Sequence, residues 1–148
     1  MTTTESIESV ETPVTITRER IADNRRADHA GEIFGVYFPL RLEPFIFDVT
    51  RKLSDEYRGG YWEFYALSNG SFYMALNSDR IFRVVCQNGF EGNLSADALG
   101  ITACLYAYSH LSFSKIDGFA DMCGRQYHLL RDYMLQHPEV AGILRAID

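Results

Sequence analysis

The stretch GGYWEFYALSNGSFYMAL, residues 59–76, predicts a β-hairpin on which the rest of the fold depends. Asn69 and Gly70 separate two apolar runs, and this pair favours a two-residue type I′ turn, whose central positions both need a positive φ. Such a turn places Ser68 opposite Ser71. The register then pairs Leu67 with Phe72, Tyr65 with Met74, Glu63 with Leu76, Ala66 with Tyr73 and Phe64 with Ala75. Both faces are apolar, so we interpret the aromatic residues as core rather than as a ligand platform.

The segments around the hairpin predict an α+β fold. Residues 80–86 are expected to add a third strand, which gives a small three-stranded antiparallel meander packed with about four to five helices. The expected helices cover residues 18–30, 43–57, 96–113, a stretch from about 118, and a last stretch after Pro138. Gly59 and Gly60 are expected to end the helix over 43–57. The helix over 96–113 is apolar nearly all round and should be buried, with Ser95 as N-cap and Asp97 in its first turn.

The expected domain organisation is a short tail followed by one domain. Residues 1–16 are rich in Thr, Ser and Glu, which is typical of a flexible N-terminal tail. Residues 17–148 are long enough to bury the core of a single α+β domain. The chain shows neither an apolar run of about 20 residues nor a secretory signal pattern. We therefore expect a cytoplasmic protein with no membrane contact.

The charge balance argues against two classes of function. The chain carries 20 acidic and 14 basic residues, a net charge of −6. A general nucleic-acid binder needs a basic face to displace counterions, so strong direct binding to nucleic acid is not expected. An acidic imitation of DNA needs dense stripes of one sign, whereas here acidic and basic residues are interspersed.

Candidate catalytic and metal-binding residues form no recognisable site. His110 could act as a general base, but a histidine near the end of a buried helix is more often structural. His128 lies one helical turn before Asp132, which could orient it, yet no nucleophile stands at a readable spacing. His29 and Glu32 form an H-x-x-E pair, which alone is a weak metal signal. Cys86, Cys104 and Cys123 lack C-x-x-C spacing, which disfavours zinc, and they are expected to be reduced. No enzyme activity, cofactor or metal is therefore predicted.

A series of motifs resembles a known family. In order they are RR at 25 and 26, FGVYF, LEPFIFD, YRGGYWEFYALSNGSFYMAL, FEGNLSADALGI and HLLRDYMLQHPEVAGILRAID, which together cover about residues 25 to 148. Their combination is similar to the ArdB/KlcA antirestriction family of plasmids and other mobile elements. The resemblance implies a compact α+β domain that protects incoming DNA from type I restriction–modification enzymes without catalysis. The resemblance assigns no catalytic residues to this chain.

The predicted partner is the type I restriction–modification complex or a host factor that controls it. Asp121, Arg125, His128 and Asp132 mark a charged helix face, and we take them as candidate partner contacts. Two other hypotheses remain. One is a DNA-binding accessory module of a mobile element with Arg18, Arg20, Arg25 and Arg26 as its basic patch, although nearby acidic residues neutralise that patch formally. The other is a small enzyme that uses His110 or His128.

Overall fold

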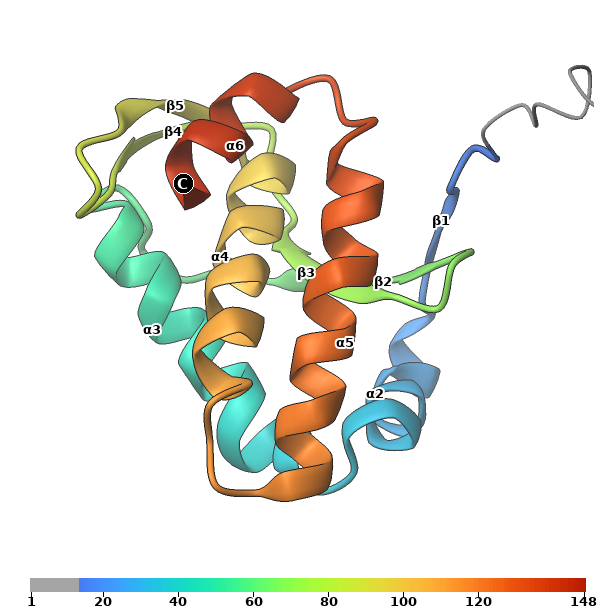
Figure 1. Ribbon diagram of the computed structural model, residues 1–148. Helices are drawn as coiled ribbons and strands as arrows, with labels where there is room; N and C mark the ends of the chain where they lie inside the picture. The colour runs from blue at the N-terminus through green and yellow to red at the C-terminus, as the bar shows by residue number, and fades with distance from the viewer. Residues whose placement is uncertain (1–13) are drawn as a thin grey trace, which may run out of the picture.

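The computed structural model describes residues 14–148, and within them the chain is an α+β fold of five helices and two small antiparallel sheets. Figure 1 shows α4 at the centre, flanked by α3 and α5, with α6 above it, β2 and β3 behind, β1 at the right, and β4 and β5 at the upper left. The helices are α2 Arg26–Phe34, α3 Glu43–Leu53, α4 Ala96–Leu111, α5 Asp117–Met134 and α6 Val140–Ile147, with short helical turns η1 Asp23–Arg25 and η2 Phe38–Leu42. The strands are β1 Arg18–Arg20, β2 Trp62–Leu67, β3 Phe72–Leu76, β4 Ile81–Val85 and β5 Glu91–Ser95. None of these helices is long and apolar enough to cross a bilayer.

The predicted meander is wrong in its third strand. The first sheet has the order β1-β2-β3, while β4 pairs with β5 in a separate sheet. The short charged segment Arg18–Arg20, expected to be helical, instead pairs with β2. The other edge of β3 is closed to a further strand because helices cover it. Residues 80–86 therefore turn back at Asn88 and Gly89 and pair with Glu91–Ser95.

The predicted hairpin exists, but its register is shifted by one residue. Phe64 pairs with Met74 and Tyr65 with Tyr73. The reason is the turn: Gly70 has a φ of +92°, but no residue other than glycine among those described has a positive φ, so Asn69 cannot sit in a type I′ turn. The loop instead has three residues closed by the Leu67 N–H bond to the Ser71 carbonyl at 2.9 Å, with glycine in the left-handed position.

The two Asn-Gly turns have the same construction. In each, the asparagine side chain accepts a hydrogen bond from the backbone two residues on, at 3.1 Å for Asn69 and 3.0 Å for Asn88. Each asparagine amide also donates to a helix carbonyl: Asn69 to Leu129 of α5 at 2.9 Å, and Asn88 to Ala146 of α6 at 3.1 Å. Each hairpin is thus tied through its turn to the helix that covers it.

Helix α3 is shorter than predicted, and α4 is as predicted. α3 ends at Leu53, so Gly59 and Gly60, despite their positive φ, belong to the loop beyond it rather than to its C-terminus. α4 begins with Ser95, whose hydroxyl accepts the Ala98 N–H at 3.1 Å, and the helix is buried along most of its length. The aromatic residues of the hairpin are mostly core: Phe72 and Tyr73 are fully buried.

The outer edge of β3 packs closely against α4. A Cβ added at Gly100 of α4 would lie 2.5 Å from the Met74 carbonyl oxygen, so only glycine lets the helix approach the strand this closely. Two buried side chains then complete the hydrogen bonding of the edge: Tyr108 donates to the Phe72 carbonyl at 2.6 Å, and Gln126 of α5 accepts the Phe72 N–H at 2.9 Å. The edge is therefore paired with side chains instead of a strand.

Gly100→Ala tests this close approach. Because the added methyl group meets backbone atoms that cannot move freely, we expect the free energy of unfolding to fall by about 1–3 kcal/mol, measured by urea denaturation. The control is Gly118→Ala, where nothing lies within 4 Å of the added atom. That variant should stay within about 0.5 kcal/mol of the wild type. Equal stability of the two variants would contradict the packing described for α4.

Candidate interaction surface

The four predicted partner contacts lie together on one face of α5. Asp121, Arg125, His128 and Asp132 are all exposed. Within residues 14–148, none of them forms a hydrogen bond or ion pair with another side chain, so all four are free to meet a partner. We call these residues the α5 stripe. Its use as a contact surface stays a prediction.

The buried face of α5 holds the stripe in a fixed position. Gln126, which the sequence did not single out, donates to the Gly70 carbonyl at 3.2 Å and accepts the Ser71 hydroxyl at 3.2 Å. Together with the bond from Asn69 to Leu129, this ties the middle of the helix to the hairpin turn. Cys123, Leu130 and Met134 are fully buried on the same side. A partner that contacts the stripe would therefore meet a rigid surface.

A polar cluster that sequence reasoning missed lies where β1, β3, α4 and the α5–α6 connection meet. Arg18 donates to Tyr73 Oη at 2.6 Å and to Asp97 Oδ1 at 2.7 Å, and the Tyr73 hydroxyl donates to the same carboxylate oxygen at 2.8 Å. His137 Nε2 lies 2.8 Å from Asp97 Oδ2, while its Nδ1 accepts the Glu139 N–H at 3.0 Å. The imidazole therefore donates its Nε2 proton to Asp97.

The charges of this cluster stabilise one another. Burial works against the ionised form of Asp97, but hydrogen bonds from His137 and Tyr73 and the charge of Arg18 hold its pKa below the ordinary value. Burial and the Asp97 charge raise the pKa of Tyr73, which stays a neutral donor. The Arg18 guanidinium also lies 4.3 Å from the centre of the Tyr65 ring. The cluster fixes β1 and the α5–α6 connection, and its geometry points to a structural role.

No periodic pattern could have revealed this cluster. Arg18 lies in a segment expected to be helical, and Asp97 is accounted for by its place in the first turn of a helix. His137 directly precedes Pro138, a position that in the sequence suggests only a helix boundary. Their separation in the sequence is large, and only the tertiary fold brings them together. The one usable signal was that Asp97 and His137 both lie within motifs that resemble the family.

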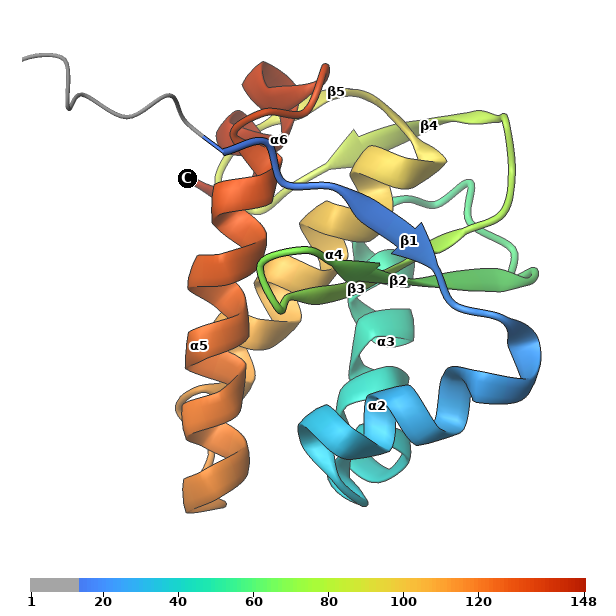
Figure 2. The same cartoon turned by 90° about the vertical axis from the view of Figure 1, so that its right-hand side faces the viewer.

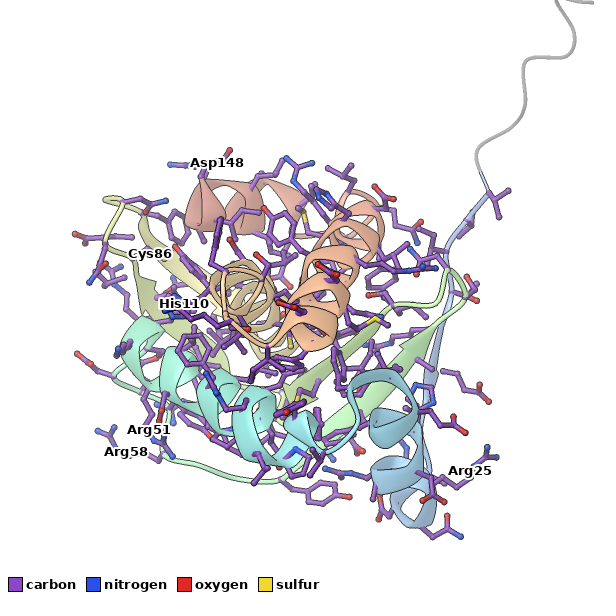
Figure 3. The ribbon with its side chains drawn as sticks, turned by 60° about the horizontal axis from the view of Figure 1, so that its bottom comes forward. Arg25, Arg51, Arg58, Cys86, His110 and Asp148 are labelled. Atoms are coloured by element: carbon purple, nitrogen blue, oxygen red, sulfur yellow. The ribbon has the colours of Figure 1, made fainter. Side chains whose placement is uncertain are left out.

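The basic patch of the DNA-binding hypothesis does not form a free cationic face. Arg18 is engaged by Asp97, and Arg20 lies 3.2 Å from Glu63 and 3.4 Å from Asp23. Arg26 is stacked over the Phe64 ring at 3.9 Å. Arg25 lies on the exposed surface of the same region, where Figure 3 labels it. With three of the four arginines occupied inside the protein, little positive charge remains for phosphates.

The histidines of the enzyme hypothesis lie on different helices. His110 is exposed in the last turn of α4 and stacks on Phe45 at 4.8 Å between ring centres. It lines a hollow of about 670 Å³ that Cys86 also borders, on the side of the molecule shown in Figure 3. Burial raises the pKa of the Cys86 thiol, so it is a poor nucleophile at neutral pH. His128 has no hydrogen bond to Asp132 in the part of the chain that the structure describes.

The remaining cysteines and the candidate metal pair offer no reactive group. Burial raises the pKa of Cys104 and of Cys123 to about 12, which is typical of structural thiols. Across residues 14–148, no three His, Cys, Asp or Glu side chains are grouped so that they could hold a metal ion. His29 and Glu32 border a polar hollow of about 340 Å³ beside β1, which Glu19 and Asp28 also line, but among the described residues these side chains are not grouped so that they could hold a metal ion.

Comparison with known proteins gives a consistent result. A family model described as "Antirestriction protein" matches residues 55–148. Two Escherichia coli proteins named antirestriction protein KlcA are 40% and 41% identical to the chain, over 90% and 94% of its length and 95% and 98% of theirs. A solved structure, from work on KlcA and ArdB, superposes with a TM-score of 0.84 at 38% identity, over 93% of this chain and 99% of that one. That work describes a novel fold and antirestriction activity against type I DNA restriction systems in vivo but not in vitro.

Asp97→Asn tests the polar cluster. The change removes a charged acceptor shared by Arg18, Tyr73 and His137, so we expect the free energy of unfolding at neutral pH to fall by about 1.5–3 kcal/mol. The pKa of Asp97 is lowered in the folded protein. Its contribution is therefore complete above the unfolded value of about 4 and is lost as the pH falls through the lower folded value.

The difference between wild type and variant should accordingly shrink as the pH is lowered below about 4. This difference in the free energy of unfolding is measured by urea denaturation, with Trp62 fluorescence as the signal. Asp132→Asn on the exposed stripe is the matched control and should change stability by less than about 0.5 kcal/mol. A loss of stability in Asp97→Asn that does not depend on pH would contradict the ionised role of this carboxylate.

Proposed function

Because the chain belongs to the antirestriction protein family, we propose that it protects incoming DNA from type I restriction–modification enzymes by binding a protein, without catalysis and without imitating DNA. The observation that carries the proposal is the match over nearly the whole chain to KlcA, in sequence and in fold. The work on KlcA and ArdB names type I systems as the target of the activity of those proteins.

The partner is the type I restriction–modification complex or a host factor that controls it. For KlcA and ArdB the activity is described in vivo but not in vitro. A living cell contains components that a purified mixture of enzyme, DNA and inhibitor lacks. This difference favours a host factor over direct inhibition of the isolated enzyme. The protein would act in the cytoplasm, where restriction enzymes meet incoming DNA, and a plasmid or other mobile element would carry its gene.

The charge distribution supports a mechanism other than DNA mimicry. Several carboxylates are paired inside this protein: Asp97 with Arg18, Glu63 with Arg20 and Glu91 with Arg83. The α5 stripe itself alternates in sign, with Asp121 and Asp132 on either side of Arg125. A DNA mimic needs a regular row of unpaired negative charges. A mixed surface of this kind is better suited to a specific protein partner, where complementary charges set orientation and selectivity.

The proposal is tested by plating unmodified phage on cells that carry a type I restriction system, with and without the protein. We expect the protein to raise the plating efficiency of unmodified phage and to leave that of modified phage unchanged. No recovery, with the protein soluble and expressed, would contradict the proposed function.

The stripe is tested in the same assay. Asp121→Lys combined with Arg125→Glu and Asp132→Lys reverses its charges, and protection should fall by about tenfold or more because like charges then face each other across the interface. Asp79→Lys, at an exposed position on the loop before β4, is the matched control and should protect as the wild type does. Full protection by the triple variant would remove α5 from the contact surface while leaving the function intact.

A further inference from the structure

A hollow bounded by α2, the η2 turn and β2 has features that packing does not explain. It has a volume of about 520 Å³. In Figure 2, α2 lies in front of the η2 turn, which it contacts, and of the start of α3. Its walls are mostly apolar, with Phe38, Pro39 and Phe64 among them, and two charged residues, Arg26 and Glu43, border it. This volume is in the range of about 300–1,000 Å³ that is usual for ligand sites.

Gly31 is the first unexplained feature. It lies inside α2, where glycine costs about 0.5–1 kcal/mol relative to alanine, and it lines the hollow. A Cβ added there would meet nothing within 4 Å, and Gly31 is not among the glycines with a positive φ. Gly100, in contrast, is required by contact with β3. Gly31 is exposed, and a side chain there would reduce the open space of the hollow.

Glu43 is the second unexplained feature of the hollow. The positive charge of Arg26 is already engaged, because its guanidinium stacks on Phe64 and donates to the Tyr61 hydroxyl at 2.5 Å, and Tyr61 donates in turn to Asp23 at 2.6 Å. Glu43 is half-buried and forms no ion pair or hydrogen bond through its side chain to the residues described. Burial raises its pKa, and Arg26 opposes this only in part. Glu43 therefore brings to the hollow a carboxyl group with no direct hydrogen-bond or ion-pair partner among the described residues, although the charge of Arg26 acts on it from nearby.

The rim adds an apolar surface. Val36, which lines the hollow, is 60% exposed. An occupant that suits this site has an apolar stem for Phe38 and Pro39 and a positively charged N–H donor for Glu43. Lysine and arginine side chains have this construction.

We propose that this hollow receives a lysine or arginine side chain from the protein partner, with its stem on Phe38 and Pro39 and its charge at Glu43. The proposal rests on the proposed function in one respect, that a protein partner exists. It adds a second contact surface, on α2 and η2, and states the chemistry that the partner presents there. Gly31 is then glycine because a larger residue would fill the space that the incoming side chain needs.

The direct test uses n-butylguanidinium as the probe and NMR titration of the isotope-labelled full-length protein. We expect saturable shifts of backbone amides around Gly31 and Gly35, and no such shifts with neutral n-butylurea. Gly31→Leu and Glu43→Gln should each abolish binding. The matched controls, Gly118→Leu at an open helical position and Asp79→Asn at an exposed loop carboxylate, should bind as the wild type does. No saturable binding by the wild type, or unchanged binding by Gly31→Leu, would overturn the proposal.

The second test is protection in the phage assay. Because leucine favours helix more than glycine does, Gly31→Leu should unfold at the same temperature as the wild type or higher. Its protection should nevertheless fall by about tenfold or more, while Gly118→Leu protects fully. Full protection by a folded Gly31→Leu would overturn the proposal and leave the proposed function standing. If the wild type itself gives no protection, the proposed function fails, and the probe titration alone decides whether the hollow takes a guanidinium group.

Discussion

The fold depends on how the outer edge of β3 is closed. A strand edge exposes backbone donors and acceptors that normally call for another strand. Here Gly100 lets α4 approach to contact distance, and Tyr108 and Gln126 supply the hydrogen bonds that a strand would have made. This closure explains why β1, the third strand of the sheet, joins at β2 instead of at β3. It also explains why β4 has to pair elsewhere and why α4 is buried on nearly every side. The positions of α5 and its exposed stripe follow from the same contacts.

The elements that the sequence predicted well are those with strong local signals. The helix at Ser95, the hairpin around Asn69 and the buried faces of α4 and α5 follow from capping, turn chemistry and periodicity. The errors have physical causes. Asn-Gly suits more than one turn, and here the asparagine side chain bonds to Ser71 and Leu129, which selects the three-residue loop. β1 is three charged residues long and has no strand signal of its own. The polar cluster could not be predicted, because its members come from distant elements.

The candidate contact surfaces differ in how they could be found. The α5 stripe is visible in the sequence as charged residues at helical spacing, and the structure shows them exposed together. The hollow beside α2 has no such pattern. Gly31 and Glu43 look ordinary in the sequence, and only the coordinates show that one has no packing reason to be glycine and that the other lacks a partner. The motifs that resemble the family fall on the hairpin and the start of α4 and also on α3, α5 and α6, so they do not by themselves mark a contact surface.

The anchoring of β1 has a consequence for synthesis of the chain. β1 can pair with β2 as soon as residue 67 has emerged, but three residues of pairing hold it weakly. Arg18 can bond to Tyr73 and Asp97 once residue 97 has emerged, but the last attachments come later, when Gln136 bonds to the backbone of Ile16 and His137 completes the Asp97 cluster. At about 5–20 residues per second, translating the roughly 40 residues between these two points takes about 2–8 s. During that interval β1 is held at the outer edge of β2 by only part of its contacts, so chaperones that shield strand edges would have their greatest effect on this protein before its last helix is made.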